Sequence, residues 1–419
     1  MVPKGWSVFR LEDIVIRTQL GTTERGMSED PLTTLIPLIK MGNLGWGSVN
    51  FNKVEYIEQS LINDSFLLKK GDFLFNTRNT PDLVGKSAVW DEDYTATFDN
   101  NINRIVFNKK VYTNFIAYYL NTGKGKSAIQ SLPAGSTSVA AIYWKDLKNI
   151  QLLLPSLGEQ QKIVQILSTW DKSIVVTGKL LTNSHRQKKA LMQQLLTGKK
   201  RLLDENGVRF SGEWEYTIFG NLGDTYTGLT GKTKEDFGAG KPYIPYINIF
   251  KNSRIDIQNL EYVQVNDDER QSVVKYGDIF FTTSSETPEE VGMSSVLLEE
   301  VSEVFLNSFC FGFRLNNFET LIPKYARYLF RSEHVRRQIS TLGQGATRYN
   351  LSKRQLIKLE LKLPCVEEQQ KIAAVLSAAD AEIYTLEKKL ACLRDEKKAL
   401  MQQLLTGKRR VKVDEAVAE

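Results

Sequence analysis

Cysteine and histidine are scarce in this chain of 419 residues, and their scarcity argues against several kinds of site. The three cysteines, Cys310, Cys365 and Cys392, are odd in number and widely spaced, so we expect neither a disulfide framework nor a metal knuckle. The two histidines, His185 and His334, lie too far apart in the sequence to suggest a zinc site. The sequence therefore predicts no metal bound by this chain.

Long apolar runs are missing as well. No stretch of about 18 apolar residues occurs, so no transmembrane helix is expected. Residues 1–14 lack an apolar signal-peptide segment, and nothing resembles a lipidation site, so we expect a cytoplasmic protein that does not contact a membrane. The net charge of +6 permits binding to a polyanion without requiring it.

Familiar catalytic motifs are also missing. Residues 21–26 have the glycines of a phosphate loop, but Met27 stands where the loop needs lysine. Asp82 and Asp146 could belong to a nuclease motif, but Gln355 takes the place of Asp146 in the second half of the chain. No Gly-x-Ser-x-Gly or His-Glu-x-x-His occurs. We therefore predict a chain that is not an enzyme and binds no cofactor of its own.

An internal repeat dominates the sequence. Residues 155–201 and 364–410 align without a gap at an offset of 209, and 25 of the 47 positions are identical. The regions before them are related more weakly: 70–77 resembles 276–283, and 84–89 resembles 291–296. The predicted organisation is a first domain at 1–154, a helix at 155–203, a second domain at 204–363, a helix at 364–410 and a disordered tail at 411–419. If the halves arose by duplication, the helices kept one role while the domains diverged.

The repeated segments have the pattern of a long coiled-coil helix. Residues 159–196 contain no proline and one glycine, Gly178, and would form a rod of roughly 57 Å. Apolar positions alternate at steps of four and three over about five heptads, so each helix needs a partner, and the simplest partner is the other copy. Thr177, Ser184 and Lys188 weaken the first seam. A plain spacer and a spacer that also docks partner proteins both fit this pattern.

Each domain mixes short strands and helices, which predicts an α/β (α+β) fold with an irregular, twisted sheet. Residues 35–44 and 241–250 are predicted to form strand pairs, whereas 114–132 and 323–342 are predicted to be helical. A strand ending in proline closes each domain, at Pro155 and Pro364.

Two polar loops recur in both domains, and their residue types suit nucleic acid. Arginine can bond guanine at two positions and asparagine can do so with adenine, while serine and threonine reach phosphates and bases. The first loop follows the strand at 72–75 or 278–281, and the second contains Gly135-Ser136-Thr137 or Gly345-Ala346-Thr347. The candidate DNA contacts are Lys40, Asn43, Asn76, Thr77, Arg78, Asn79, Lys86, Gly135, Ser136, Thr137, Asn248, Thr282, Thr283, Ser284, Ser285, Gly345, Thr347 and Arg348.

With these features in place, the chain resembles the specificity subunit of type I restriction–modification systems. The resemblance rests on Trp6, the Gly71-Asp72 and Gly277-Asp278 strands, the Gly135-Ser136-Thr137 loop and the twice-present EQQKI…LTGK helices, and it covers nearly the whole chain. It implies two target-recognition domains in a pseudo-twofold tandem repeat, each reading half of a bipartite double-stranded DNA site. It also implies that the two helices pack antiparallel as a ruler between the half-sites.

The resemblance further implies partner subunits. Two modification subunits would carry S-adenosylmethionine and methylate adenine, and restriction subunits would add an ATP- and Mg-dependent nuclease. The candidate docking residues on the helices are Gln160, Gln161, Lys162, Met192, Gln193, Gln369, Gln370, Lys371, Met401 and Gln402. Two other hypotheses stay open: an enzyme that reads and also cuts or methylates DNA, and a coiled-coil scaffold whose domains bind protein.

Overall fold

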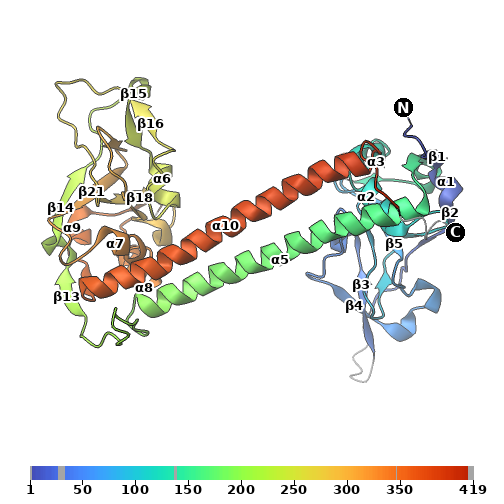
Figure 1. Cartoon of the computed structure of the whole chain (residues 1–419), viewed down its shortest axis with the longest axis horizontal. Coiled ribbons are helices and arrows are strands. Elements are labelled where there is room, and N and C mark those ends of the chain that lie inside the picture. The colour runs from blue at the N-terminus through green and yellow to red at the C-terminus, as the bar shows by residue number, and fades with distance from the viewer. Residues whose placement is uncertain (1, 27–33, 136–138, 346, 414–419) are drawn as a thin grey trace. The chain divides into compact units, whose positions relative to one another are not determined.

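The chain forms two compact units in the computed structural model, which describes residues 2–26, 34–135, 139–345 and 347–413 (Figure 1). Unit 1 contains residues 1–177 and 389–419, and unit 2 contains residues 178–388. Each unit holds one globular domain and a part of each of two 39-residue helices, α5 (Leu157–Leu195) and α10 (Val366–Leu404). None of the described helices is long and apolar enough to cross a membrane.

The domain of unit 1 is built from small sheets in the strand orders β2-β9-β5-β7, β4-β3-β8, β10-β11-β6 and β1-β12. Its strands are β1 (Ser7–Arg10), β2 (Val15–Leu20), β3 (Leu35–Ile39), β4 (Glu55–Glu58), β5 (Phe73–Asn76), β6 (Arg78–Asn79), β7 (Ser87–Val89), β8 (Thr97–Phe98), β9 (Ile102–Phe107), β10 (Ala134–Gly135), β11 (Ala140–Ala141) and β12 (Gln151–Leu154). Its short helices are α1 (Leu11–Ile14), α2 (Thr113–Leu120), α3 (Gly123–Gln130) and α4 (Trp144–Leu147).

The domain of unit 2 repeats this plan with sheets in the orders β14-β21-β17-β19, β16-β15-β20, β18-β22 and β13-β23. Its strands are β13 (Glu215–Ile218), β14 (Gly223–Thr227), β15 (Phe237–Ile244), β16 (Glu261–Val263), β17 (Ile279–Thr282), β18 (Ser284–Ser285), β19 (Ser294–Val296), β20 (Phe305–Leu306), β21 (Cys310–Leu315), β22 (Tyr349–Asn350) and β23 (Glu360–Leu363). Its helices are α6 (Tyr246–Lys251), α7 (Pro323–Leu329), α8 (Glu333–Thr341) and α9 (Lys353–Leu356). The predicted mixture of helices and sheets in a tandem repeat is thus confirmed.

Two details of the predicted secondary structure are wrong. Residues 35–44 form β3 and a helical turn instead of two strands, because the Asn43 side chain accepts a hydrogen bond from the Lys40 backbone and closes the turn. Residues 241–250 form the end of β15 and then α6, which starts after Pro245. The strands that end each domain are as predicted, at β12 and β23.

The aspartate of the Gly-Asp pair that immediately precedes β5 and β17 has a structural role in each domain. The Asp72 carboxylate pairs with Arg104 of β9, 3.2 Å away, and the Asp278 carboxylate accepts two hydrogen bonds from Arg314 of β21. Burial of Tyr226, together with its bond to Asp278, holds the pKa of its hydroxyl far above the ordinary value. This charged cluster fixes the central strands next to one another.

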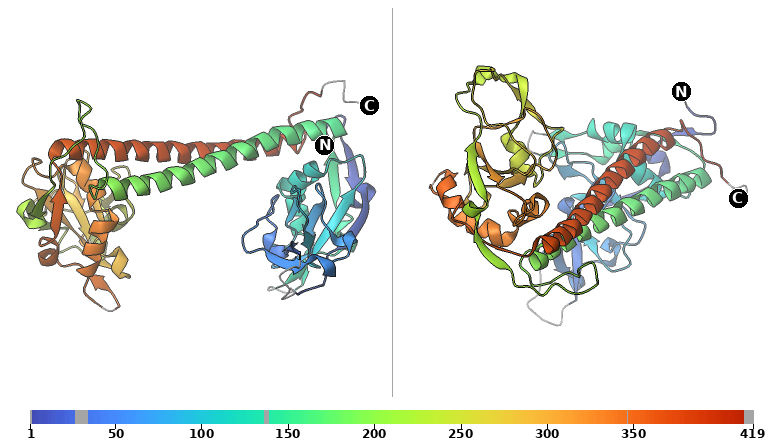
Figure 2. Two further views of the ribbon diagram at one scale, coloured as in Figure 1. Left: turned by 90° about the horizontal axis from the view of Figure 1, so that it is seen from below. Right: turned by 60° about the vertical axis from the view of Figure 1, so that its left-hand side comes forward.

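The predicted seam positions of both helices are buried or half-buried. In unit 1, Ile163 and Leu167 of α5 and Leu404 of α10 belong to the hydrophobic core of the domain. In unit 2, Leu195 of α5 and Leu376 of α10 belong to the corresponding core. Each unit therefore packs the start of one long helix beside the end of the other, as Figure 2 shows from two further sides.

Gln160 and Gln369 hold each long helix against its own domain. The Gln160 side chain accepts from the Tyr112 backbone (2.8 Å) and donates to the carbonyls of Lys110 and Pro155. Gln369 makes the same three bonds, to the Ile322 backbone (3.1 Å), Thr320 and Pro364. Both are 1% exposed or less, so the prediction that these two glutamines face a partner is wrong.

A buried glutamate lies beside each of these glutamines. Glu159 accepts two hydrogen bonds from Arg410, which follows the end of α10, and Glu368 accepts two from Arg201, which follows the end of α5. These bonds raise the pKa of both guanidinium groups. About three turns further along each helix, Asp171 pairs with Lys397 and Asp380 pairs with Lys188, both at 2.5 Å.

The sequence predicts a disordered tail at 411–419, but the first residue of this segment is part of the folded unit. Val411 packs against the core of unit 1, so it is not part of a free tail. Residues 414–419 lie outside the described part of the chain.

We predict that Glu368→Gln destabilises unit 2. Loss of the carboxylate leaves Arg201 without its charged acceptor, which costs about 1–3 kcal/mol. Amide hydrogen exchange at the start of α10 should show a lower free energy of opening. Glu367→Gln is the matched control, because Glu367 is exposed, and equal exchange in the two variants would contradict the prediction.

Candidate nucleic-acid interface

The two predicted DNA-contacting loops of unit 1 meet in one small sheet. The chain leaves β5 at Asn76 and forms β6, which pairs with β11, and β11 in turn pairs with β10. Arg78 lies opposite Ala141, and Gly135 lies opposite Ala140. Arg78 is exposed and Asn79 is half-buried. Ser136 and Thr137 lie outside the described residues.

Unit 2 brings its two loops together in the same way. β18 pairs with β22, with Ser284 opposite Asn350 and Ser285 opposite Tyr349. The loop before β22 exposes Gly345, Thr347 and Arg348. Loops that are about 60 residues apart in the sequence therefore form one surface in each unit. We call it the reading surface, and its described residues are 76–80 with 134–135 and 139–141 in unit 1, and 282–286 with 344–345 and 347–350 in unit 2.

A third segment supports each reading surface: residues 99–101 in unit 1 and residues 307–309 in unit 2. It was not identified from the sequence. The Thr77 backbone and hydroxyl both donate to the Asn101 carbonyl, at 2.9 Å each. The Thr283 backbone (3.0 Å) and hydroxyl (2.7 Å) donate to the Phe309 carbonyl in the same way. Thr77 and Thr283 are predicted from the sequence to contact DNA, but in the structure their hydroxyls bond the backbone of this third segment. The segment carries no repeated sequence motif that could have identified it.

Two predicted DNA contacts, Asn43 and Asn248, are structural. Asn43 is 5% exposed, and its side chain bonds the backbones of Lys40 and Asn50, at 3.0 Å each. Asn248 is 3% exposed and bonds the Asp256 backbone through both its amide and its carbonyl group, as well as the Asn259 carbonyl. Because these side chains are fully occupied inside the fold, the prediction that they read bases is wrong.

Three further candidates, Asn76, Thr282 and Ser285, are also buried. The Asn76 side-chain oxygen accepts from the Arg78 backbone amide (3.1 Å), and the Thr282 hydroxyl accepts from the Met293 backbone amide (3.0 Å). The Ser285 hydroxyl donates to the Thr287 carbonyl. These side chains shape the reading surface from within, and the prediction that they touch DNA is corrected accordingly.

The remaining candidates are partly accessible. Lys40 forms an ion pair with Glu55 at 2.5 Å, and its side chain is 29% exposed. Lys86 and Ser284 are half-buried. The Ser284 carbonyl accepts from the hydroxyl of Tyr246, whose pKa is raised by burial.

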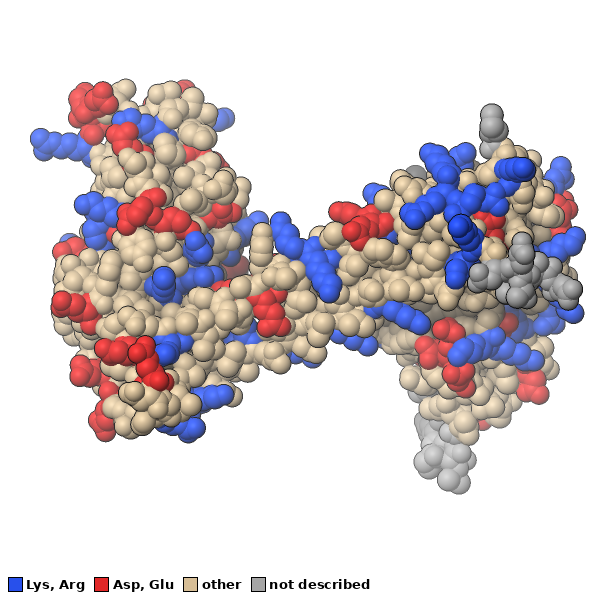
Figure 3. All heavy atoms as spheres, viewed as in Figure 1, with Lys and Arg blue, Asp and Glu red and all other residues tan. Residues whose placement is uncertain are grey.

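Basic residues near these loops divide into two groups. Arg331 and Arg336 are half-buried and donate to backbone carbonyls, and desolvation lowers the pKa of each to about 10. Lys124 is exposed on α3, and Lys126 lies over the Trp46 ring at 4.0 Å. Figure 3 shows Lys and Arg side chains gathered in the region of unit 1 where α3 and the end of α10 lie in Figure 1. A positive surface of this kind attracts phosphate backbones.

The predicted docking residues of the helices differ in accessibility. Met192 and Met401 are half-buried and pack against the cores of their units. Their role in packing is enough to explain why methionine occupies both positions. Gln161, Gln370 and Gln402 are exposed, as is Gln193, which donates to Glu333. Lys162 and Lys371 are half-buried.

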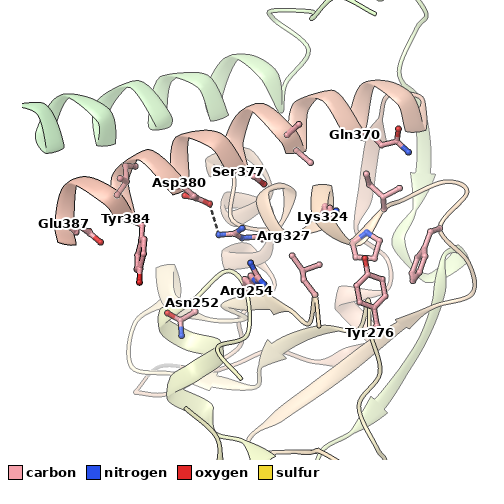
Figure 4. Close-up of a pocket in the computed structure, with 18 residues that line it drawn as sticks. Asn252, Arg254, Tyr276, Lys324, Arg327, Gln370, Ser377, Asp380, Tyr384 and Glu387 are labelled. Atoms are coloured by element: carbon pink, nitrogen blue, oxygen red, sulfur yellow. Dashed lines mark hydrogen bonds and ion pairs between the residues drawn. The ribbon is translucent and has the colours of Figure 1, made fainter. Parts of the chain in front are cut away.

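Gln370 lines a groove of about 1230 Å³ between α10 and the domain of unit 2. Figure 4 shows Gln370 near one end of the groove and Tyr384 and Glu387 near the other. Between them, Arg327 donates to Asp380 at 2.7 Å. Tyr384 is 60% exposed, so the groove offers both an aromatic surface and polar groups.

The family model for the type I restriction modification DNA specificity domain matches residues 3–183 and 212–392. The chain is 26% identical to the putative type I restriction enzyme MjaX specificity subunit of Methanocaldococcus jannaschii, over 98% of this chain and 95% of that one. It is 21% identical to the type I restriction enzyme EcoKI specificity subunit of Escherichia coli strain K12, over 93% and 85% of the two chains.

Solved structures show the same fold. The S subunit of a type I restriction-modification system from M. genitalium aligns with a TM-score of 0.57 and 16% identity, over 96% of this chain and 99% of that one. A chain from a structural study of assembly and conformational transition of the type I R-M system has the same TM-score and 17% identity, over 98% of this chain and all of the other.

We predict that Asn248→Ala acts on stability and not on DNA contacts. Removing the side chain leaves buried backbone groups unpaired, which should cost about 1–3 kcal/mol and lower the melting temperature of unit 2. Below that melting temperature, DNA affinity should stay at the level of the unmodified chain. A lower affinity with unchanged melting would contradict the structural role.

Proposed function

The chain belongs to the type I restriction-modification DNA specificity family, and we propose that each of its units reads one half of a bipartite double-stranded DNA target. The observation that carries this proposal is the twice-built reading surface. The scaffold is the same in both units, but the side chains on it differ: Arg78 and Asn79 in unit 1 stand where unit 2 has Ser284 and Ser285. A shared scaffold with different polar groups suits two different half-sites.

As a specificity subunit, the chain supplies DNA sequence recognition to a type I restriction–modification complex, and catalysis belongs to the other subunits. We propose that α5 and α10 act as an antiparallel coiled-coil spacer that sets the distance between the half-sites. Each helix is continuous over 39 residues, or roughly 58 Å at 1.5 Å per residue. The buried seam and the Glu–Arg pairs in each unit support this role, because they leave the helix ends little freedom to shift.

The proposed partners are two modification subunits, with restriction subunits joining them. In this proposal S-adenosylmethionine, ATP and Mg are bound by those partners. The groove beside α10 supports docking of a modification subunit to unit 2, because exposed Gln370 and Tyr384 line a space that the chain itself leaves open. Gln161, at the position of Gln370 in the first repeat, offers the same exposed amide in unit 1.

The test of the function is long-read mapping of methyladenine in host DNA with this gene intact and deleted. Loss of one bipartite methylated motif on deletion is the expected result, and it identifies the target sequence directly. An unchanged methylation pattern, in cells where the modification subunit is shown to be active, would refute the proposed function.

We predict that Arg78→Ala and Arg348→Ala relax opposite halves of that motif. Each exposed guanidinium can discriminate a base pair, so its loss should weaken binding to the matched half-site by about tenfold or more. Methylation mapping in strains that carry each variant measures the change. Arg337→Ala is the control, because Arg337 is exposed on α8, is not one of the residues of the reading surface, and pairs with Glu333. Relaxation of both halves by one variant would contradict this assignment.

We predict that Ala374→Arg blocks assembly with a modification subunit at unit 2. Ala374 is exposed and lines the groove, so an arginine there fills space that the partner needs. Size-exclusion chromatography with light scattering should show one modification subunit bound where the unmodified chain binds two. Ala391→Arg places the same side chain at an exposed position of α10 outside the groove and should assemble normally. If both variants assemble like the unmodified chain, the groove is not the docking site.

A further inference from the structure

The turn that supports each reading surface has the same backbone framework in both units. It consists of residues 99–101 in unit 1 and residues 307–309 in unit 2. The first residue of the turn bonds the end of the neighbouring strand: Asp99 donates to the Ile39 carbonyl (3.0 Å) and Asn307 to the Ile244 carbonyl (3.1 Å). The side chain of that residue then accepts from the third backbone amide, at 3.0 Å from Asn101 and 2.8 Å from Phe309.

The turn is closed on its other side as well. Ile102 donates to the Asp99 carbonyl at 2.9 Å, and Cys310 donates to the Asn307 carbonyl at 3.0 Å. The carbonyl of the third residue accepts two hydrogen bonds from Thr77 or Thr283. The backbone of this third residue is therefore held rigidly next to the reading surface in both units.

The side chain at that third position differs between the units. Asn101 is half-buried, and its amide lies 3.4 Å from the Asp99 carboxylate. Phe309 is 62% exposed, whereas Phe280, Phe281 and Phe311 on the adjoining strands are fully buried. A single exposed apolar side chain is ordinary on a protein surface. Here, however, it stands on a backbone that is bonded to Thr283, the residue before Ser284, at a position where the other unit has a polar residue.

We propose that Phe309 determines specificity in unit 2 by contacting the methyl group of a thymine in its half-site. This inference rests on the proposed function and extends it to one residue and one base. The thymine methyl is the apolar group that base pairs present in the major groove, so an apolar side chain on a rigid turn next to the reading surface can distinguish it. Asn101, at the equivalent position in unit 1, has no such apolar surface, and an asparagine amide can instead form hydrogen bonds with adenine.

The experiment uses the chain assembled with its modification subunits and a duplex containing the mapped target. Each thymine of the half-site relaxed by Arg348→Ala is replaced in turn by deoxyuridine, which pairs identically but lacks the methyl group. We expect one position at which the unmodified complex loses about fivefold to tenfold in affinity. Phe309→Ala should bind the thymine duplex that much more weakly and should show no further loss with deoxyuridine.

Two more variants and a control sharpen the result. Phe309→Leu keeps an apolar side chain and should retain most of the preference for thymine, whereas Phe309→Asn introduces the residue of unit 1 and should lose it. Tyr216→Ala removes an aromatic side chain that is 74% exposed on β13, outside the reading surface, and should bind like the unmodified complex. Because Phe309 is exposed, none of its variants should lower the melting temperature.

The failures can be told apart. If the unmodified complex prefers its target but Phe309→Ala matches it on every duplex, this inference is wrong and the proposed function stands. The same holds if Phe309→Ala weakens binding equally to all sequences, or impairs assembly with the modification subunits in the absence of DNA. If the unmodified complex shows no preference for its target, the proposed function itself fails, and this inference fails with it.

Discussion

A carboxylate with almost no contact with solvent stands at the start of each long helix, and the position of the helix depends on how that charge is compensated. Removing a carboxylate from water is costly unless it is paired and hydrogen-bonded. Glu159 and Glu368 obtain this pairing from arginines that follow the end of the opposite helix. The adjacent Gln160 and Gln369 then bond three backbone groups of the domain. In each unit the domain, the start of one helix and the end of the other are therefore held together by the same few side chains.

This arrangement accounts for the unequal similarity of the two halves. The repeated segments at 155–201 and 364–410 supply the glutamates, the glutamines and the arginines, so a change in one requires a compensating change elsewhere. The domains are less constrained than the helices. They must keep only their strands and the charged pair between Asp72 or Asp278 and the neighbouring arginine. Side chains on the reading surface and on its supporting turn are free to differ: Arg78 in unit 1 corresponds to Ser284 in unit 2, and Asn101 corresponds to Phe309. A family of DNA readers needs this combination of a fixed frame and variable contacts.

The reading surface also shows why buried polar residues are needed beside a binding site. Asn76, Thr282 and Ser285 hold the short strands in place, and Thr77 and Thr283 tie those strands to the supporting turn. Contacts to bases discriminate only when they are held in register with the base edges, so the side chains behind the surface contribute to specificity without touching DNA.

The amino-acid sequence by itself determined the tandem organisation, the two long helices with their seam, the loops that carry the reading surface, and the family. These features follow from local periodicity and from a repeat that can be read along the chain. Only the tertiary structure decided which polar residues face outward. Asn43 and Asn248 look like base readers in the sequence, but their side chains bond backbone groups of the loops that follow them, 7 and 11 residues along the chain. Gln160 and Gln369 look like docking residues, but they bond backbone groups 50 and 49 residues away. The turn at 99–101 and 307–309 has no sequence signature either, because its role arises from hydrogen bonds to threonines in another segment, and such pairings exist only after the chain has folded.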